Sequence, residues 1–481
     1  MTATGQERRS AGRPKNNDSY DIAVVGAGSA GFSAAITAAE LGARVALIGH
    51  GTIGGTCVNV GCVPSKALIR AAEALHHANA ARRFAGIDSR ARLKDWNSLR
   101  AQKDELVTSL RQANYADLLP AYGGIAYLEG QARLGNGGVA VDGRHIDAGK
   151  VIVATGAQEF VPPIPGIDDV AYLTSTSALD LETLPESLIV IGGGSVGSEL
   201  AQMFARAGVE VTITFRSRLL PKAEPEISTA LASCFEDEDI TPRHVDAYES
   251  IQARHDGIAL AVRVDGSVET LEARHVLVSA GREANTAGLG LEESGVALTA
   301  NGGIEVDAQM RTSKAGIYAA GDVTGRDQYV YMAAHGAKIA AANAIAGDTR
   351  GYDRQAMPVV VFTDPQVASV GLTEADATAR GLGVKSSVLS LDNLPRALTA
   401  RDTRGLIKLV AESATGKLLG AHILAPEGGD SIQTAALAIK QGMTYAELGE
   451  MIFPYLTTVE GLKLAAQTFD RDVSKLSCCA G

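Results

Sequence analysis

Two cysteines with four residues between them, Cys57 and Cys62, could do redox chemistry. Their run opens with paired glycines and ends at Lys66, in a stretch that favours a helix. A disulfide needs its Cα atoms within about 7 Å, which this spacing allows in a loosened helical turn but not in an extended strand. A thiol at a helix start and near a lysine should also have a lowered pKa. The alternative is a pair of buried structural cysteines.

A second pair, Cys478 and Cys479, stands close to the end of the chain. Adjacent cysteines close only a small, strained ring when oxidised, whereas as thiolates they can share one soft metal ion. The alternative is a tail with incidental cysteines, although exposed thiols are a liability. The fifth cysteine, Cys234, lies in a helical pattern, and we expect it to be a small buried apolar residue.

Two glycine-rich turns each follow a short apolar run and precede a helical pattern. Such a turn lets the backbone approach a pyrophosphate, with the helix amides facing the phosphates. A lone motif of this kind is weak evidence, but inside a strand–helix–strand pattern it becomes strong, and two of them indicate two dinucleotides. The turns are Gly26, Gly28 and Gly31, after the run 22–25, and Gly192, Gly194 and Gly197, after the run 188–191.

The strand after each turn should end in an acidic residue that binds a ribose. In the first unit the chain instead reads Gly49-His50, so His50 or backbone groups around Gly51 are the candidates for this contact. In the second unit Arg216 and Arg218 stand at the acidic position. Two arginines suit a 2′-phosphate, so we expect NADPH there, the alternative being that both are merely solvated.

The chain has 481 residues, too many for one hydrophobic core, and its length suggests about three domains. A net charge of −11 with no basic run argues against a nucleic-acid partner. No apolar run reaches the roughly 18 residues that a membrane span needs. The first nineteen residues lack the apolar segment of a signal peptide, so we expect a cytoplasmic protein.

Apolar spacing predicts the elements that must position these residues. Helices are expected over 67–81, 98–119, 431–441 and 445–451. Short strands separated by Gly and Asn turns are expected from 125 to 146, and single strands over 150–153, 358–362, 406–411 and 418–424.

The string from Gly54 to Lys66, together with the two glycine turns, resembles the redox-active segment of the pyridine nucleotide-disulfide oxidoreductases. The resemblance covers nearly the whole chain after residue 20. It implies an α/β fold with two Rossmann-like dinucleotide-binding domains, for FAD and NADPH, and an α+β C-terminal dimerisation domain that makes a homodimer. The expected boundaries are a disordered N-terminus at 1–19, FAD-binding parts at 20–158, with the redox disulfide, and 283–352, an NADPH-binding domain at 159–282, and a dimerisation domain with the Cys-Cys tail at 353–481.

The resemblance also implies roles for single residues. Cys62 would lie nearer the flavin ring and Cys57 would face the substrate, while Lys66 and Glu199 would pair beside the ring. Asp322 would hold the ribityl chain of the FAD, one per subunit. The full expected cofactor-binding set is Gly26, Gly28, Gly31, Gly51, Thr56, Lys66, Asp322, Val330, Gly192, Gly194, Gly197, Glu199, Arg216 and Arg218.

The C-terminal region separates members of this family from one another. Its disulfide-reducing members carry a His-Pro dipeptide followed by a glutamate, the histidine acting as base for the leaving thiol. Here Glu460 is present but Tyr455 stands in place of the histidine. A phenol with a pKa near 10 is a poor base at neutral pH, so thiol–disulfide exchange would lack its proton carrier.

The tail therefore resembles the branch of the family that reduces Hg(II) to volatile Hg(0) with NADPH, in mercury detoxification. That resemblance implies that Cys478 and Cys479 of one subunit bind Hg(II) and pass it to the Cys57–Cys62 site of the other. Tyr115 would line the metal path with Tyr455. Residues 1–19 hold no cysteine, so delivery is expected to depend on the terminal pair or on small thiols.

Two other functions fit part of the pattern. A large-type thioredoxin reductase also ends in a redox-active pair, but it would keep the histidine that Tyr455 replaces. A flavin-containing protein that binds metal without turnover would not need two intact nucleotide motifs.

Overall fold

The structure is a computed structural model that describes residues 19–135 and 137–473. The expected disordered segment 1–19 lies outside the described residues except for Ser19, and the terminal cysteine pair lies outside them too. The chain divides into two compact units. The first unit comprises the residues up to Asn59, Thr108–Gln158 and Glu283–Tyr352, and the second comprises Val60–Val107, Glu159–Arg282 and the residues from Asp353 onwards.

The first unit is built on a mainly parallel sheet with the strand order β3-β2-β1-β6-β5-β4, and β16 pairs with β6 outside this order. Neighbouring strands β1 and β2 are parallel, with Val25 opposite Ile48, as a strand–helix–strand unit requires. The strands are β1 (Ser19–Val25), β2 (Val45–Gly49), β3 (Ile125–Glu129), β4 (Ala132–Gly135), β5 (Gly138–Val141), β6 (Arg144–Val153) and β16 (Ile317–Ala319).

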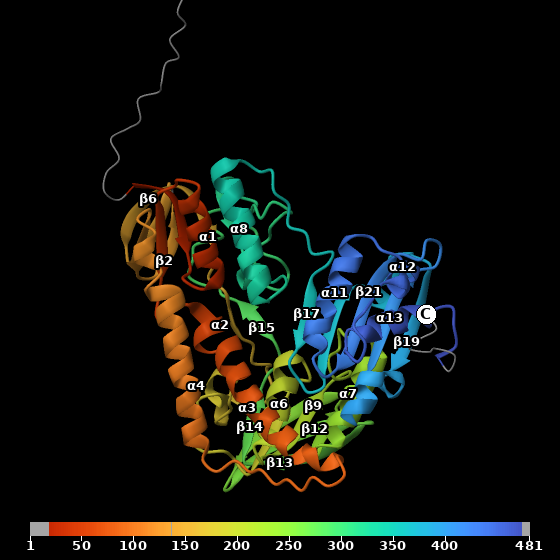
Figure 1. The fold of residues 1–481 in the computed structure, drawn as a ribbon. Coiled ribbons are helices and arrows are strands. Elements are labelled where there is room, and N and C mark those ends of the chain that lie inside the picture. Colours follow the sequence, from red (N-terminus) through yellow and green to blue (C-terminus); the bar gives the residue numbers. More distant parts are fainter. Residues whose placement is uncertain (1–18, 136, 474–481) are drawn as a thin grey trace, which may run out of the picture. The chain divides into compact units, whose positions relative to one another are not determined.

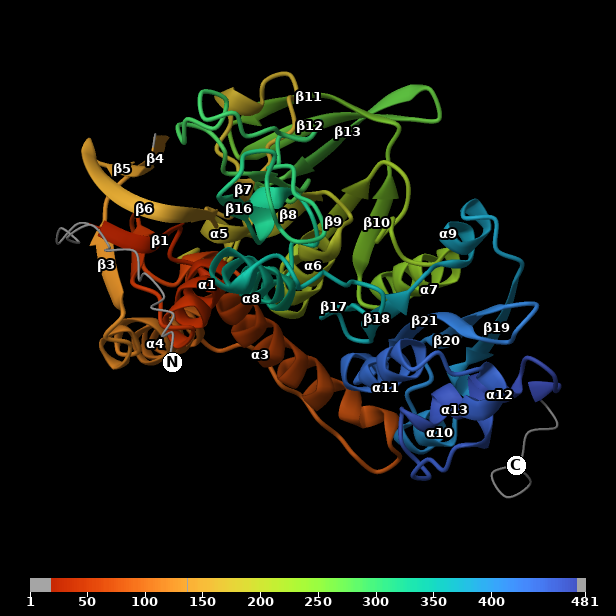
Figure 2. The same ribbon diagram turned by 90° about the horizontal axis from the view of Figure 1, so that it is seen from above.

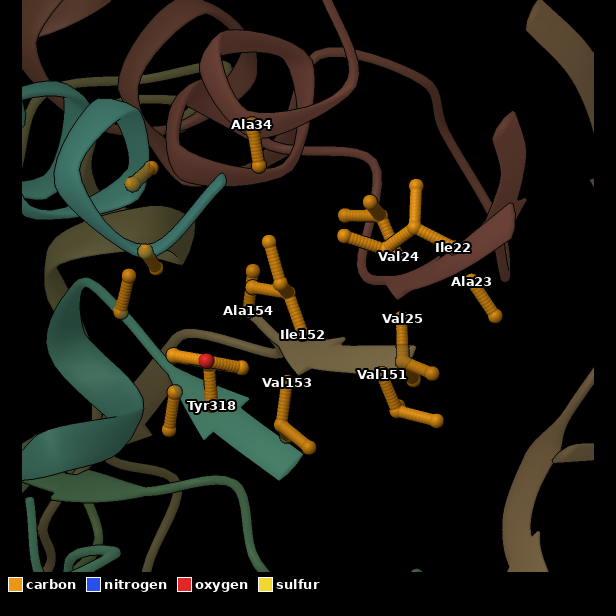
Figure 3. Close-up of a cluster of buried hydrophobic side chains, with 14 of the residues drawn as sticks. Ile22, Ala23, Val24, Val25, Ala34, Val151, Ile152, Val153, Ala154 and Tyr318 are labelled. Atoms are coloured by element: carbon orange, nitrogen blue, oxygen red, sulfur yellow. The ribbon is translucent and has the colours of Figure 1, made fainter. Parts of the chain in front are cut away.

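Helices α1 and α8 pack against each other and against this sheet (Figures 1 and 2). Figure 3 shows Ile152 of β6 pointing towards Ala34 of α1, while Val153 points to the opposite face of the sheet. Both residues are fully buried, so the sheet is apolar on both faces, as expected for parallel strands. The helical segments of this unit are α1 (Ser29–Glu40), α2 (Gly55–Asn59), the π-helical turn η2 (Gln112–Ala116), η3 (Leu119–Ala121), η5 (Asp322–Thr324) and α8 (Val330–Ala346).

The second unit contains a parallel sheet in the order β10-β9-β8-β14, an antiparallel sheet β11-β12-β13 and an antiparallel sheet β17-β18-β21-β20-β19. Its strands are β8 (Ser187–Ile191), β9 (Glu210–Phe215), β10 (Ile240–His244), β11 (Ala247–Arg254), β12 (Gly257–Val264), β13 (Ser267–Ala273), β14 (His275–Val278), β17 (Pro358–Val361), β18 (Gln366–Gly371), β19 (Val384–Ser390), β20 (Leu406–Glu412) and β21 (Leu418–Ala425).

Helix α3 packs against α6 in this unit, and α11 covers β17, β18 and β21. Helix α4 and the paired strands β7 and β15 contain three of the five points where the chain passes between the units; the other two are at 59/60 and 352/353. These elements are α3 (Cys62–Ala80), η1 (Ala81–Arg83), α4 (Trp96–Arg111), β7 (Ala157–Glu159), η4 (Ile167–Asp169), α5 (Ser175–Ala178), α6 (Ser195–Arg206), α7 (Pro225–Glu236), β15 (Arg282–Ala284), α9 (Glu374–Ala379), η6 (Leu391–Asn393), α10 (Pro395–Ala400), α11 (Gly428–Lys440), α12 (Tyr445–Glu450) and α13 (Glu460–Gln467).

The expected α/β fold class is confirmed, and most expected elements are present within a few residues. One helix was predicted too long: the pattern over 98–119 forms α4 only as far as Arg111, followed by a π-helical turn and a 3₁₀ turn. Another was predicted too short, because α3 begins at Cys62 and not at residue 67. No helix among the described residues is long and apolar enough to cross a membrane.

Candidate functional site

The first glycine turn connects β1 to α1 and has no room for a side chain at its first and third glycines. Gly26 has a φ of 117°, and a Cβ there would lie 2.1 Å from the carbonyl oxygen of Ala154. A Cβ on Gly31 would lie 1.7 Å from the carbonyl oxygen of Gly26. Gly28 is the N-cap of α1, and no side chain caps the helix. The first amides of α1 are therefore left for the phosphates of a ligand.

The second turn, between β8 and α6, repeats this geometry. Gly192 has a φ of 118°, and a Cβ on Gly197 would lie 1.9 Å from the carbonyl oxygen of Gly192. Gly194 is the N-cap of α6, again with no side-chain cap, and a Cβ there would meet nothing within 4 Å. The space over Gly194 suits a pyrophosphate, so both turns fit a bound dinucleotide.

The two cysteines of the redox segment lie on two consecutive helices, Cys57 on the short helix α2 and Cys62 on the long helix α3. Cys57 is half-buried on α2 of the first unit, and Cys62 is the exposed first residue of α3 in the second unit. The expected position of a cysteine at a helix start is therefore found at Cys62. The positive end of the α3 dipole favours the thiolate form there.

Side-chain hydrogen bonds fix the shape of the loop that carries Cys57. Asn59 donates through Nδ2 to the carbonyl oxygens of Ile53 and Gly55, at 2.9 Å each. Arg111, the last residue of α4, donates to Asn59 Oδ1 at 3.2 Å. The loop is thus held by a side chain from another part of the first unit.

Lys66 and Glu199 are brought together in the second unit, 2.6 Å apart. Glu199 is only 6% exposed, and its second oxygen accepts the backbone N–H of Phe362 at 2.9 Å. The Lys66 ammonium also lies 4.9 Å from the centre of the Phe362 ring. The buried carboxylate is satisfied on both oxygens, so this pair is well ordered.

Further along α6, Gln202 and Arg206 bind the segment that follows Phe362. Gln202 accepts the N–H of Asp364 and donates to its carbonyl oxygen, both at 2.8 Å. Arg206 pairs with the Asp364 carboxylate at 3.0 Å. One face of α6 therefore fixes the loop between β17 and β18.

Glu73, His77 and Asp364 each bring one ligand atom within 4.8 Å of the others, the spacing of a metal site. Burial alone would raise the pKa of Asp364, but a hydrogen bond from His77 and the charges of Arg206 and Arg404 outweigh it and hold the pKa well below its usual range. The carboxylate is thus already neutralised by cations. We interpret the cluster as an ion-pair network.

Tyr115 lies in the π-helical turn η2, a rare geometry that is frequent at functional sites. Its hydroxyl is 3.2 Å from Ser29 Oγ at the start of α1, and its ring meets the Phe32 ring edge-on at 4.8 Å. A Cβ on Gly54 would lie 3.3 Å from the Tyr115 ring. The tyrosine is therefore next to both the first glycine turn and the redox segment of its unit.

Tyr455 is 55% exposed in the loop before α13. Glu460, the buried first residue of α13, accepts the N–H of Leu456 at 3.1 Å. Leu456 has a φ of 63°, an unusual backbone conformation for leucine, which this bond supports. Glu460 thus shapes the loop that presents Tyr455.

The two arginines at the end of β9 differ in what they contact. Arg218 donates to the carbonyl oxygens of Pro221 and Ala223, at 3.0 and 2.9 Å, and so folds the loop that follows. The exposed side chain of Arg216 has no hydrogen bond or ion pair with any described residue. Arg216 is therefore the better placed of the two to meet a phosphate.

The remaining expected cofactor-binding residues lie at ends of elements. Asp322 opens η5 and Val330 is the first residue of α8, both half-buried. Gly51 follows β2 and Thr56 is on α2, both exposed.

Burial raises the pKa of Cys234 to about 11, so this fifth thiol is inert at neutral pH.

Three residues of this region were not predicted from the sequence: Asn59, Arg111 and Phe362. Phe362 contacts the Lys66–Glu199 pair through its backbone N–H and its ring. It is 163 residues from Glu199 in the sequence, so no local sequence pattern predicts this contact. Asn59 stands inside the redox string, where its amide two residues after Cys57 could have been identified as a loop-closing group.

The chain matches two family models. Residues 20–341 match the model described as pyridine nucleotide-disulphide oxidoreductase, and residues 357–466 match the dimerisation domain of the same family.

Sequence relatives cover almost the whole chain. It is 46% identical to a mercuric reductase of Streptomyces lividans, over 96% of this chain and 98% of that protein. It is 48% identical to a mercuric reductase of Shigella flexneri, over 96% of this chain and 82% of that protein, and 45% identical to one of Bacillus cereus, over 97% and 74%. Among solved structures, the Cu(II) complex of the HOCl-induced flavoprotein disulfide reductase RclA from Escherichia coli is similar, with a TM-score of 0.82 and 31% identity over 94% of this chain and 99% of that one.

Proposed function

The chain belongs to the pyridine nucleotide-disulphide oxidoreductase family, and we propose that within it the protein reduces Hg(II) to Hg(0) with electrons from NADPH through FAD. One observation carries the proposal. A chain that aligns with mercuric reductases over nearly its whole length also has the Cys57–Cys62 redox string and Tyr455 at the position of the usual histidine.

The inner thiols bind the metal where it is reduced. When bound, NADPH and FAD supply the two electrons, so that one Hg(II) dithiolate, one NADPH and one proton give Hg(0), NADP⁺ and two thiols. Cys57 and Cys62 take Hg(II) from its thiol ligands by exchange, because soft thiolates are the ligands it prefers. Cys62 is the first residue of α3, where the helix dipole favours the thiolate that this exchange needs.

Metal delivery uses the terminal pair. Cys478 and Cys479 of one subunit receive Hg(II) from small thiols and hand it to Cys57 and Cys62 of the other subunit. The homodimer that this requires is supported by the match of residues 357–466 to the dimerisation domain. Two successive dithiol sites transfer the ion by ligand exchange, without releasing it into water.

The two tyrosines guide the metal between these sites. Tyr455 presents a phenol from an exposed loop, and that loop is held by Glu460. Tyr115 stands beside Gly54, next to the redox string. A neutral phenol does not hinder the transfer of Hg(II) between thiolates, but it does not take a proton from a thiol at neutral pH. Hg(II) transfer is therefore favoured over thiol–disulfide exchange.

The second dinucleotide is NADPH and the enzyme acts in the cytoplasm. The free guanidinium of Arg216 at the end of β9 supports a contact with the 2′-phosphate, as a carboxylate at this position would not.

The test is NADPH oxidation by the purified protein in excess small thiol, with and without Hg(II), while mercury vapour leaving the solution is measured. We expect oxidation that depends on Hg(II), with one Hg(0) released per NADPH. No response to Hg(II), combined with turnover of a disulfide substrate, would favour a disulfide reductase and refute the proposal.

A further inference from the structure

Strand β2 ends at Gly49, where a dinucleotide fold normally places the acidic residue that binds the ribose. This position is not empty space. A Cβ on Gly49 would lie 2.5 Å from the hydroxyl oxygen of Tyr127, 2.9 Å from the Cε2 atom of the same ring and 2.8 Å from the Cβ of Ala27. No side chain fits at position 49, because the end of the Tyr127 side chain already occupies that place.

Tyr127 comes from β3, the strand next to β2. The two strands are parallel, with Leu47 opposite Tyr127 and Gly49 opposite Glu129. Because side chains alternate along a strand, Tyr127 and Glu129 lie on the same face. Glu129 is the last residue of β3, so both side chains stand at the carboxyl edge of the sheet, where such folds bind their ligands.

The chemistry of this corner suits a sugar diol. Burial and the nearby charge of Glu129 raise the pKa of Tyr127, so the phenol remains protonated and can donate a hydrogen bond. Its hydroxyl makes no hydrogen bond with any residue that the structure describes. Ala27, whose Cβ would lie 2.8 Å from the same added Cβ on Gly49, is part of the turn between β1 and α1 that fits the pyrophosphate. The hydroxyl is therefore available on the side of the sheet where the dinucleotide turn lies.

We propose that Tyr127 and Glu129 hold the adenosine ribose of FAD in place of the acidic residue that β2 lacks. The Tyr127 hydroxyl donates to one ribose oxygen, and the Glu129 carboxylate accepts from a ribose hydroxyl. This arrangement requires glycine at position 49, since only glycine leaves room for the Tyr127 side chain. The inference rests on the FAD-binding part of the proposed function and is independent of Hg(II) as substrate.

The experiment titrates apoprotein with FAD, and separately with FMN, which has no adenosine ribose, and follows flavin fluorescence. Tyr127→Phe keeps the ring but loses the hydroxyl. We expect its Kd for FAD to rise roughly three- to tenfold, the effect of one lost hydrogen bond, with the Kd for FMN unchanged. Tyr122→Phe, a half-buried tyrosine of the same unit, is the matched control and should leave both values unchanged.

A second set of variants tests the exchange between the strands. Gly49→Glu alone should weaken FAD binding, because the new side chain overlaps Tyr127. The double variant Gly49→Glu with Tyr127→Ala makes room for an acid on β2, and its Kd for FAD should return towards that of the wild type. Glu129→Ala should raise the Kd for FAD by about tenfold and leave FMN unaffected, as expected for a hydrogen bond to a charged group.

An unchanged Kd for FAD in Tyr127→Phe would show that the tyrosine only fills space and would overturn the inference. Equal weakening of FAD and FMN would overturn it as well, since the effect would then be on the sheet. Tight FAD binding with the expected variant effects but no Hg(II) turnover would support the inference while refuting the proposed function.

Discussion

At the scale of single residues, Glu199 shows how one buried carboxylate serves two groups. It pairs with Lys66, whose side chain is 30% exposed, and it accepts the N–H of Phe362. A carboxylate that is 6% exposed is stable only while its charge is compensated. Lys66 is therefore a structural partner of Glu199 as well as a candidate neighbour of the flavin.

This argument predicts that Lys66→Met destabilises the protein. Glu199 would keep only the Phe362 N–H, and we expect the free energy of unfolding to fall by roughly 1–3 kcal/mol, less than for a fully buried pair because Lys66 is partly solvated. Urea denaturation of the FAD-bound protein measures the change. Lys338→Met, an exposed lysine on α8, is the control, with an expected change below about 0.5 kcal/mol. Equal losses in both variants would contradict the role given to the pair.

The pKa shifts of the neighbouring histidines His76 and His77 predict that their contributions to the free energy of unfolding depend on pH in opposite directions. The hydrogen bond to Asp364 raises the pKa of His77 above its unfolded value of 6.5. Its stabilisation is therefore complete below that value and is lost as the pH rises through the folded pKa. His77→Gln should lower the free energy of unfolding at a pH of roughly 5.5, and by less at about 8.5. We expect only about 0.5–1 kcal/mol at the lower pH, because the His77 side chain is half-exposed.

His76 provides the matched comparison. Burial lowers the pKa of His76, so below 6.5 the unfolded state binds the extra proton and the wild type loses stability as the pH falls. His76→Gln removes that loss. The free energy of unfolding of the variant should therefore rise relative to that of the wild type as the pH falls. Thermal unfolding of both variants across this range measures the slopes. Two slopes of the same sign would refute the assignment.

At the scale of elements, α6 presents Glu199, Gln202 and Arg206 on one face, three and four residues apart, and so holds the loop after β17. Gln202 is 3% exposed and binds both backbone groups of Asp364. Removing it leaves the buried N–H without its acceptor, whereas the carbonyl oxygen keeps a bond from Arg206 at 3.1 Å.

Gln202→Ala is therefore expected to lower the free energy of unfolding by about 2 kcal/mol, chiefly the cost of one orphaned buried donor. Gln202 also donates to Glu238 at 3.1 Å, but that carboxylate keeps its bond from Arg206. The control is Gln252→Ala, the same substitution at an exposed site on β11, with an expected change below about 0.5 kcal/mol. Chemical denaturation at neutral pH compares the two variants. A loss no larger than that of the control would mean that water replaces the side chain at this loop.

The same elements show what the sequence could and could not reveal. The glycine turns at Gly26 and Gly192 were predictable, because their backbone angles and lack of space allow only glycine and are encoded locally. The end of α4 at Arg111 was not, since the residues up to 119 keep a helical spacing. The π-helical turn places Tyr115 against Ser29 and Phe32, and that contact depends on tertiary packing.

At the scale of the whole molecule, the proposed route of Hg(II) makes each catalytic centre a product of two subunits. In this proposed route the terminal pair of one chain would serve the inner pair of the other, so that a symmetric dimer would contain two equivalent composite centres. This arrangement differs in a measurable way from delivery within one chain. A homodimer that lacks either pair cannot distinguish the two routes, because both of its centres are damaged.

A hybrid dimer separates the two routes. One chain carries Cys57→Ala with Cys62→Ala, and the other carries Cys478→Ala with Cys479→Ala, each with a different affinity tag so that the hybrid can be purified. With delivery between subunits, the intact tail of the first chain faces the intact inner pair of the second, and one of two centres is complete. We expect about half of the wild-type rate of NADPH oxidation with thiol-ligated Hg(II).

Delivery within one chain leaves no complete centre in this hybrid, because the chain with the tail lacks the inner pair and the chain with the inner pair lacks the tail. The homodimer without the tail gives the background of direct transfer from small thiols to Cys57 and Cys62. The hybrid has one intact inner pair and that homodimer has two, so a hybrid rate at half of that background would refute the transfer between subunits. Reduction of Hg(II) itself would still be seen in the wild type. A rate well above the background requires that the tail of one subunit reach the inner thiols of its partner.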